Sequence, residues 1–328
     1  MSRNILVAGA GGFIGGWLVN ELSKDVSNKI LCVDIKPISE WHQVFSGTQN
    51  LVADLKNPEI CLETTNDIEQ IYNLAADMGG MGFIENNKAL CMLSVLINTN
   101  LLVAAKANKV KKYFFASSAC VYSSYAQTKP NNLGLKESEA YPADPEDGYG
   151  WEKLFSERMC RHFYEDFGIE TRVARFHNVY GPKGTWNGGR EKAPAAICRK
   201  VAEAKITGKH EIEIWGDGKQ TRSFTFIEDA IKGVNLLMNS EIREPINIGS
   251  SELVDLNKLV DLVEEIAQIS NLKRVYNLNA PRGVIGRNSD NTKIQSLLNW
   301  EPKVELRNGL TETFEWVYNQ IQSEKSVI

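Results

Sequence analysis

The sequence predicts an α/β fold: a Rossmann-type doubly wound parallel sheet with a smaller C-terminal α/β substrate-binding lobe. Three features predict it: a glycine-rich turn after the first strand, strand-like runs that alternate with helical patterns, and a change of texture after residue 176. Such alternation gives parallel strands joined by right-handed crossovers. We expect a dinucleotide-binding domain over 1–176, to which part of 224–250 passes back, and a mainly substrate-binding lobe over 177–328.

The glycine-rich turn lies between a short apolar run, 4–8, and a helical pattern. Its glycines are spaced GxxGxxG, which allows a tight turn and lets a pyrophosphate approach the helix N-terminus. A strand before the motif and a helix after it make the signal specific. The turn predicts these cofactor contacts: Gly9, Gly12, Phe13, Ile14 and Gly15.

An acidic residue ends each of the next two predicted strands. The second strand, 30–33, ends at Asp34, 19 residues after Gly15. A carboxylate there accepts hydrogen bonds from the ribose hydroxyls and repels a 2′-phosphate, so the sequence favours NAD over NADP. The third strand, 51–55, brings Asp54 within reach of the adenine.

The remaining elements follow in order. A fourth strand over 71–76 leads into a Gly/Met loop, 77–82, at the sheet edge where ligands bind. A helix over 89–107 precedes the fifth strand. The other predicted strands cover 172–176, 211–215, 223–226 and 246–248, and the other predicted helices cover 195–204, 228–238 and 256–269, with a last helix from about 310.

The candidate catalytic groups lie between 113 and 153. The fifth strand ends in Ser118 and Cys120, whose spacing places both side chains on one side of a strand. Tyr149 and Lys153 lie four apart, so they share one helical face. The ammonium is expected to lower the pKa of the phenol and make it a base for an alcohol that loses hydride.

Three basic residues on loops of the second half, Lys192, Arg222 and Arg287, form a candidate clamp for a substrate diphosphate. The net charge of −4 carries no signature of nucleic-acid binding, and we see no apolar run of membrane-spanning length. Six scattered cysteines include no CxxC pair, so no metal site is expected. The N-terminus lacks the pattern of a signal peptide, so a cytoplasmic location is expected.

These motifs resemble the extended short-chain dehydrogenases/reductases that act on nucleotide sugars. The longer stretches NLAADMGGMGFI (73–84), FFASSACVY (114–122), GREKAPAA (189–196), WGDGKQTRSFTFI (215–227) and GRNSDN (286–291) are similar to the branch of that family that epimerises GDP-mannose at C3 and C5. The resemblance implies an isomerase that works as a homodimer with bound NAD, and it adds Ala75 to the cofactor contacts.

The resemblance also implies a mechanism. NAD oxidises C4 of the sugar, with Tyr149 as base, assisted by Lys153 and Ser118. The 4-ketone acidifies the protons on C3 and C5, Cys120 removes one, and Lys192 protonates the opposite face. The implied substrate contacts are Gly79, Ser118, Cys120, Asn178, Glu191, Lys192, Ala193, Pro194, Lys200, Gln220, Thr221 and Arg222, with Arg287 on the diphosphate.

Two positions depart from the family pattern: Ser94 replaces an Asn of the long helix, and Ile285 replaces an Arg. Several alternatives stay open. A related GDP-sugar such as a GDP-heptose is another candidate substrate, and a 4-epimerase would need neither Cys120 nor Lys192. A 4,6-dehydratase would carry Thr-Asp-Glu at 118–120, and a non-catalytic NAD sensor would lack the Tyr/Lys pair.

Overall fold

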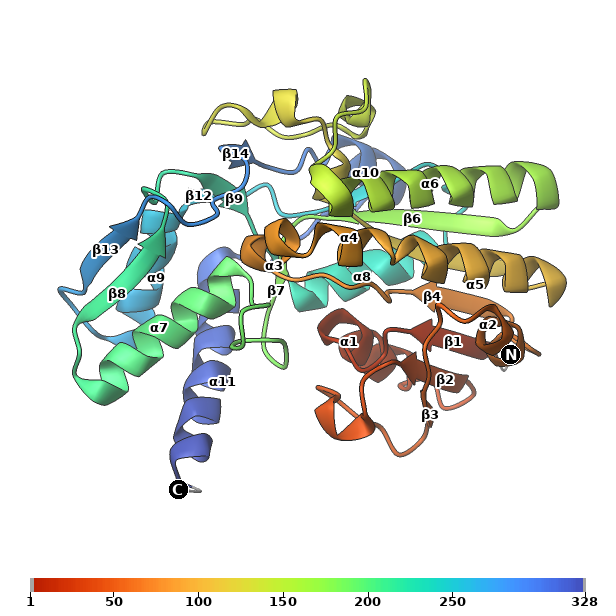
Figure 1. Ribbon diagram of the computed structural model, residues 1–328, viewed down its shortest axis with the longest axis horizontal. Coiled ribbons are helices and arrows are strands. Elements are labelled where there is room, and N and C mark those ends of the chain that lie inside the picture. The colour runs from red at the N-terminus through yellow and green to blue at the C-terminus, as the bar shows by residue number, and fades with distance from the viewer. Residues whose placement is uncertain (1–2, 327–328) are drawn as a thin grey trace.

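The computed structural model describes residues 3–326, and a seven-stranded parallel sheet forms its centre (Figure 1). The strand order β11-β6-β5-β4-β1-β2-β3 confirms the predicted doubly wound fold. The strands are β1 (Asn4–Ala8), β2 (Lys29–Asp34), β3 (Gln49–Val52), β4 (Gln70–Asn73), β5 (Lys112–Ser118), β6 (Glu170–Phe176) and β11 (Ile246–Ile248). The order reverses between β1 and β4, where a sheet of this kind forms its ligand crevice.

Successive side chains of a strand point to opposite faces of the sheet, so both faces are apolar. Helices cover both faces and form one apolar core on each. Ile5 and Val7 of β1 belong to one core, with α1 (Phe13–Leu22) and α8 (Ile227–Met238). Leu6 and Ala8 belong to the other. The helices on that face are α2 (Pro58–Thr64), α5 (Val95–Ala107) and α6 (Asp147–Phe167).

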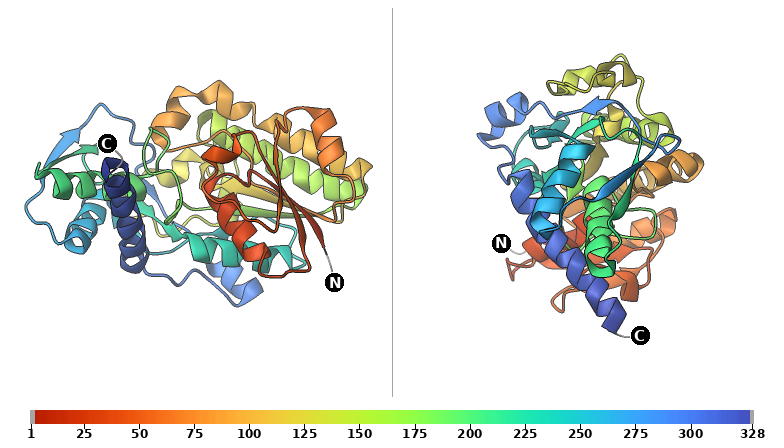
Figure 2. Two further views of the ribbon diagram at one scale, coloured as in Figure 1. Left: turned by 90° about the horizontal axis from the view of Figure 1, so that it is seen from below. Right: turned by 90° about the vertical axis from the view of Figure 1, so that its left-hand side faces the viewer.

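The second lobe is built on three helices that pack together: α7 (Ala193–Thr207), α9 (Leu256–Ala267) and α11 (Leu306–Ser326) (Figure 2). Its small sheets pair β8 (Glu211–Trp215) with β13 (Lys273–Asn277), and order β12 (Leu253–Asp255), β9 (Thr221–Ser223) and β14 (Gly286–Arg287). Between the lobes, β7 (Val179–Tyr180) pairs with β10 (Thr225–Phe226).

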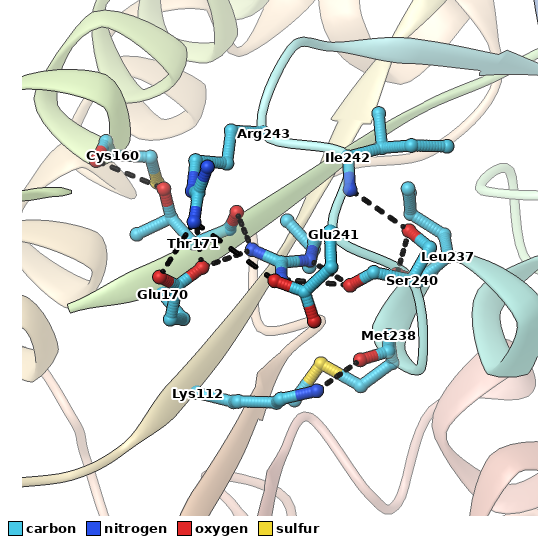
Figure 3. Close-up of polar contacts among 11 residues, drawn as sticks. Lys112, Cys160, Glu170, Thr171, Leu237, Met238, Ser240, Glu241, Ile242 and Arg243 are labelled. Atoms are coloured by element: carbon cyan, nitrogen blue, oxygen red, sulfur yellow. Dashed lines mark hydrogen bonds and ion pairs between the residues drawn. The ribbon is translucent and has the colours of Figure 1, made fainter. Parts of the chain in front are cut away.

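The chain returns to the first domain through α8 and β11. Figure 3 shows how the loop between them is held: Lys112 Nζ donates to the carbonyl of Met238, and Arg243 pairs with Glu170 at 3.0 Å. The fully buried guanidinium of Arg172 donates to the carbonyl of Ser240 at 2.7 and 2.9 Å. These contacts fix the returning segment beside β6, so that β11 can pair with β6 and form the edge of the sheet.

Several predicted bounds differ from the structure. β3 begins and ends earlier than predicted, so Asp54 lies in a loop rather than on a strand. The predicted helix over 89–107 divides into α4 (Lys88–Met92) and α5, and α3 (Met81–Asn86) begins inside the predicted Gly/Met loop. The short elements β12, β13, β14 and α10 (Thr292–Leu298) were missed because so few residues carry no clear periodicity.

One segment corrects an expectation about apolar runs. Lys88–Ala107 has the length and composition of a membrane-spanning helix, with a mean hydropathy of 1.6 and 44% of it buried inside the protein. The core helix of a soluble protein passes the same test. Here the segment is broken between α4 and α5 and packs on the sheet, with part of its apolar surface left exposed.

Candidate active site

The glycine turn has the geometry of a dinucleotide cradle. Gly9 adopts φ +82°, and a Cβ there would lie 2.9 Å from the amide nitrogen of Ala75. A Cβ on Gly15 would lie 2.1 Å from the carbonyl oxygen of Gly9, so the turn accepts no side chain at either position. Gly12 caps α1 without a side-chain hydrogen bond, which leaves the first N–H groups of the helix for an anion.

Asp34 lies at the carboxyl end of β2, beside this turn. Its side chain is buried, and Oδ1 accepts the backbone N–H of Lys36 at 3.0 Å. The ammonium of Lys36 donates to the carbonyl of Gly11 at 2.9 Å, so it is already engaged in the turn. Asp54 holds its own loop by accepting the N–H of Lys56. The turn and Asp34 therefore fit the diphosphate and adenosine ribose of a dinucleotide.

Cys120 reaches the site by a route that differs from the predicted one. β5 ends at Ser118, and Ala119–Val121 form a 3-10 turn. The hydroxyl of Ser118 accepts the N–H of Cys120 at 3.2 Å and so caps this turn. A capped turn therefore brings the side chains of Ser118 and Cys120 together. The prediction that both lie on one strand was wrong, because the strand ends at Ser118.

The start of α6 is packed directly on this turn. Glu146 donates its N–H to the carbonyl of Cys120 at 2.9 Å. A Cβ on Gly150 would lie 2.4 Å from the same carbonyl oxygen, so only glycine allows the approach. As a result, Cys120 and Tyr149 share one small buried cluster with Cys91 and Ile84.

Tyr149 and Lys153 lie on one face of α6, as predicted, but their electrostatics differ from the prediction. Burial raises the pKa of Tyr149 well above its usual value, and the hydroxyl of Ser118 acts in the opposite direction. The ammonium of Lys153 is 5.5 Å from the phenol ring and 3.3 Å from the buried carboxylate of Glu152. Because Glu152 balances the Lys153 charge, that ammonium does not overcome the effect of burial on the phenol.

Lys192 enters the same site from the second lobe. It precedes α7, and its backbone approaches the Gly/Met loop: a Cβ on Gly80 would lie 2.4 Å from the carbonyl oxygen of Glu191. A Cβ on Gly79 would lie 3.2 Å from the Cα of Arg190. Burial lowers the pKa of the Lys192 ammonium, and the negative charge of a Cys120 thiolate would raise it, so the two groups lie close enough to act on each other.

Arg287 lies at the thiol. Its Nη1 is 3.6 Å from the Sγ of Cys120, its Nε donates to Gln127 at 2.6 Å, and its Nη2 is 2.7 Å from the carboxylate of Glu146. The pKa of Cys120 is raised to about 11: burial and the carboxylate of Glu146 raise it, and Arg287 lowers it. The predicted diphosphate contact of Arg287 stays a prediction.

Arg222 completes the basic group. Its guanidinium donates to the carbonyls of Thr221 and Val284 at 2.7 and 2.6 Å. Burial lowers its pKa to about 10, and the charge of Arg287 lowers it as well. The structure thus brings Lys192, Arg222 and Arg287 to one place around Cys120, and their action on a substrate diphosphate stays a prediction.

The other predicted substrate residues lie in the second lobe or close to it. Glu191 and Lys200 line an open cavity of about 910 Å³ against β8, while Ala193 and Pro194 form the first turn of α7. Gln220 donates to the carbonyl of Trp215, and its buried Oε1 has no hydrogen-bond partner. In β9 and after β6, two side chains bond to the backbone: Thr221 to Pro130 and Asn178 to Ser223.

The departures from the family pattern are now located. Ser94 is buried between α4 and α5, and its hydroxyl accepts the N–H of Asp77 at 2.9 Å. One turn later, Asn98 bonds to Asn73 and Tyr113. Ile285 is 40% exposed beside the clamp. Among residues 3–326, no group of three or more His, Cys, Asp and Glu side chains is placed to hold a metal.

Three residues of the site escaped the sequence analysis: Gln127, Glu146 and Glu152. Gln127 lies in a 3-10 turn with no motif around it. Glu146 and Glu152 flank Tyr149 in the sequence, and their proximity to it was the available signal. Nothing in the spacing indicated that either carboxylate would be buried.

The fold and the site define an NAD-dependent enzyme of nucleotide-sugar metabolism, and the comparisons identify its family. The model of the NAD dependent epimerase/dehydratase family matches residues 5–249, and the chain belongs to that family. It is 46% identical over 323 residues to "GDP-mannose 3,5-epimerase 1" of Oryza sativa subsp. indica. The aligned residues cover 98% of this chain and 83% of the relative.

Solved structures of the family have the same fold. The UDP-glucose 4-epimerase of Thermotoga maritima, solved with UDP-glucose, superposes with a TM-score of 0.86 at 25% identity and covers 97% of this chain and 100% of its own. The UDP-glucuronic acid 4-epimerase of Bacillus cereus, solved with UDP-glucuronic acid and NAD, gives 0.79 at 25% identity, with coverages of 97% and 100%. The predicted family and cofactor, NAD, are confirmed.

Proposed function

We propose that this protein is an isomerase that inverts C3 and C5 of a GDP-sugar, converting GDP-mannose to GDP-L-galactose, GDP-L-gulose or both. The observation that carries the proposal is a second acid–base pair, Cys120 and Lys192, beside the Tyr149/Lys153 pair. A simple 4-epimerase needs only the latter. The 46% identity to a GDP-mannose 3,5-epimerase supports the same substrate.

The first chemical step is oxidation at C4. NAD held by the glycine turn and Asp34 would supply the hydride chemistry that this oxidation and the final reduction need. Tyr149 takes the proton of the C4 hydroxyl and gives it back at the end of the cycle. The Ser118 hydroxyl lowers the pKa of the phenol and so opposes the effect of burial. The ammonium nitrogen of Lys153 lies 3.3 Å from the carboxylate of Glu152 and 5.5 Å from the centre of the phenol ring.

The second step is inversion beside the transient 4-ketone, which acidifies the protons on C3 and C5. Inversion needs a base on one face of the sugar and an acid on the other. Cys120 is the base, and the guanidinium of Arg287 at 3.6 Å stabilises its thiolate. Lys192 is the acid: burial lowers the pKa of its ammonium, which makes it a better proton donor.

The second lobe supplies the nucleotide contacts. Arg287, which is buried, and Arg222, which is partly exposed, are the charges that we assign to the diphosphate, and the cavity lined by Glu191 and Lys200 is large enough for a base and ribose. Whether the sugar is mannose or a related GDP-heptose depends on groups that contact the sugar carbons beyond C4.

The decisive experiment is incubation of the purified enzyme with GDP-mannose, followed by chromatographic separation of the products. We expect GDP-L-galactose, GDP-L-gulose or both to form. Parallel incubations with a GDP-heptose and with UDP-glucose are the comparisons. Faster turnover of the GDP-heptose would identify it, instead of GDP-mannose, as the preferred substrate. Turnover of UDP-glucose alone would contradict the proposal.

Asp34 is expected to make the enzyme select NAD. Its carboxylate at the end of β2 repels a 2′-phosphate, so NAD+ should bind more tightly than NADP+ when apo-protein is titrated with each. Asp34→Asn should reduce the difference in affinity between NAD+ and NADP+. Glu40→Gln, which changes an exposed carboxylate on the following turn, is the control and should preserve it. Tighter binding of NADP+ by the wild-type protein would remove Asp34 from this role.

The homodimer predicted from the family resemblance is proposed to form through α5 and α6. These helices pack side by side on one face of the sheet (Figure 1). Each of four apolar side chains along them exposes between 41% and 54% of its surface: Leu96, Val103, Trp151 and Phe155. Exposed apolar side chains gathered on neighbouring helices mark an interaction surface, and a second copy presents a matching one.

Introducing charge on this face is expected to separate the protomers. Leu96→Glu with Phe155→Glu should give a monomer by light scattering, because an interface does not accommodate unpaired charges. Val26→Glu, at a distant and 96% exposed position, is the control. A wild-type monomer that floats with lipid vesicles would instead assign the apolar face to a membrane.

The predicted cytoplasmic location remains a proposal. All six cysteines are free and buried, which is typical of a reducing compartment. Fractionation of the source cells, with the protein followed by antibody, would test it.

A further inference from the structure

Glu146 is a buried carboxylate in the site to which the reaction assigns no task. It immediately precedes α6, and its N–H bonds the carbonyl of Cys120 at 2.9 Å. Its side chain, 12% exposed, contacts Arg287 at 2.7 Å. Both carboxylate oxygens are buried and accept no hydrogen bond of good geometry, so the contact is chiefly one of charge with charge.

A guanidinium thus lies between a thiol and a carboxylate. Arg287 presents Nη1 to the sulfur and Nη2 to Glu146, while Gln127 holds its Nε. If Arg287 were alone, its charge would stabilise the Cys120 thiolate. With Glu146 ionised beside it, the two charges largely cancel at the sulfur.

We propose that Glu146 is a positioning residue for Cys120: its carboxylate holds Arg287 against the thiol, offsets the guanidinium charge, and so sets the pH range in which Cys120 removes a proton. The proposal rests on the proposed function in assigning Cys120 as the base. It goes beyond that function in naming the group that controls the base.

The charged and titratable groups around the sulfur come from four other elements. Besides Glu146 and Arg287, they are Tyr149 on α6, Lys192 before α7 and Arg222 on β9. Of these, Glu146 is the carboxylate that acts on the thiol, and it raises the pKa of Cys120 while Arg287 lowers it. Removing the carboxylate charge therefore lowers the pKa, and the thiolate forms at lower pH.

The test uses Glu146→Gln, which keeps the size of the side chain and removes its charge. Cys120 of the substrate-free holoenzyme is alkylated with iodoacetamide between pH 7 and 9, and its peptide is followed by mass spectrometry. A fall of one pKa unit raises the thiolate fraction about tenfold and lowers its nucleophilicity about threefold, so the rate should rise at least about threefold. Cys91, in the same cluster, reports any opening of the structure and should not react faster.

Asp147→Asn is the matched control. Asp147 is the next residue, but its exposed carboxylate pairs with Lys88 instead of Arg287. This variant should alkylate at the wild-type rate. An unchanged or slower rate at Cys120 in Glu146→Gln, with Asp147→Asn also unchanged, would overturn the proposal.

A second comparison covers the case in which Glu146→Gln leaves Arg287 unpaired and the protein does not fold. Arg287→Gln and the double variant Glu146→Gln/Arg287→Gln are then compared. The double variant should alkylate at least about threefold faster at Cys120, because only the single variant retains the carboxylate charge. Equal rates would overturn the proposal.

The pH dependence of catalysis gives a readout that a purely structural role would not change. The acidic limb of deuterium uptake at C3 and C5 should move to lower pH by about one unit in Glu146→Gln. If the wild-type enzyme exchanges no carbon-bound hydrogen, the proposed function fails, but the alkylation experiment still tests the role of Glu146.

Discussion

Tyr149→Phe is expected to lose about 10²–10⁴-fold in turnover while it binds NAD and GDP-sugar almost normally. The phenol is buried against Cys91 and Cys120, and phenylalanine keeps that packing. The loss therefore reports the hydroxyl, which moves the proton of the C4 alcohol. Steady-state turnover and calorimetric titration of both ligands are the measurements.

Tyr113→Phe is the matched control because it also removes a buried hydroxyl. That hydroxyl donates to Asn98 at 2.8 Å and accepts from Asn73 at 2.9 Å, away from the reaction. We expect it to lower the free energy of unfolding by about 1–3 kcal/mol and to leave turnover intact. Near-wild-type turnover in Tyr149→Phe would show that another group is the base.

Cys120→Ala is expected to abolish most exchange of carbon-bound hydrogen with solvent. In D2O the wild-type enzyme should place deuterium at C3, C5 or both, and none at C4. The variant should still oxidise C4, seen as reduced-cofactor absorbance, because Tyr149 and the cofactor site are unchanged. Lys192→Ala should also cripple inversion by removing the acid on the opposite face.

Cys91→Ala is the control for this experiment. Cys91 is fully buried in the same cluster, but it is Cys120 whose sulfur contacts Arg287. Removal of the Cys91 side chain should leave a small cavity, and exchange of carbon-bound hydrogen should stay normal. Product formed by the wild-type enzyme without deuterium at C3 or C5 would contradict the mechanism and indicate chemistry at C4 alone.

The pH dependence of this exchange follows from the site. Burial raises the pKa of Cys120 to about 11 in the substrate-free protein. The thiolate fraction therefore increases as pH rises toward that value, and exchange should increase with it. Deuterium uptake followed from pH 6 to 9 should show a rising limb, and uptake that falls over this range would assign the base to another group.

The fold was predictable because local sequence encodes it strongly. The turn at Gly9 and Gly15 admits no side chain, and strand–helix alternation then specifies a parallel sheet. Motif residues such as Tyr149 and Lys153 were located for the same reason: helical spacing alone puts them on one face. The end of β3 was placed too late because an exposed edge strand has a weak apolar pattern.

The electrostatics of the site were not predictable from spacing. Lys153 was expected to lower the pKa of Tyr149, but burial is the larger effect and Glu152 lies 3.3 Å from the ammonium. The burial depends on how α6 packs on β5 and on the turn at Ala119–Val121, which the spacing of residues in the sequence does not show. Likewise, the clamp residues Lys192 and Arg287 are 95 positions apart, and only the folded chain shows that both act on Cys120.

The two groups that we propose as base and acid of the inversion are held by the fold in different ways. Cys120 is fixed, because Gly150 and Glu146 pin its carbonyl to the start of a 21-residue helix. Lys192 follows Gly188 and Gly189, both at positive φ with open space around them, and rests on the loop at Gly80. In the proposed reaction two different carbons must reach the same sulfur in succession, and a base packed against a helix start opposite an acid on a glycine-flanked segment would suit that requirement.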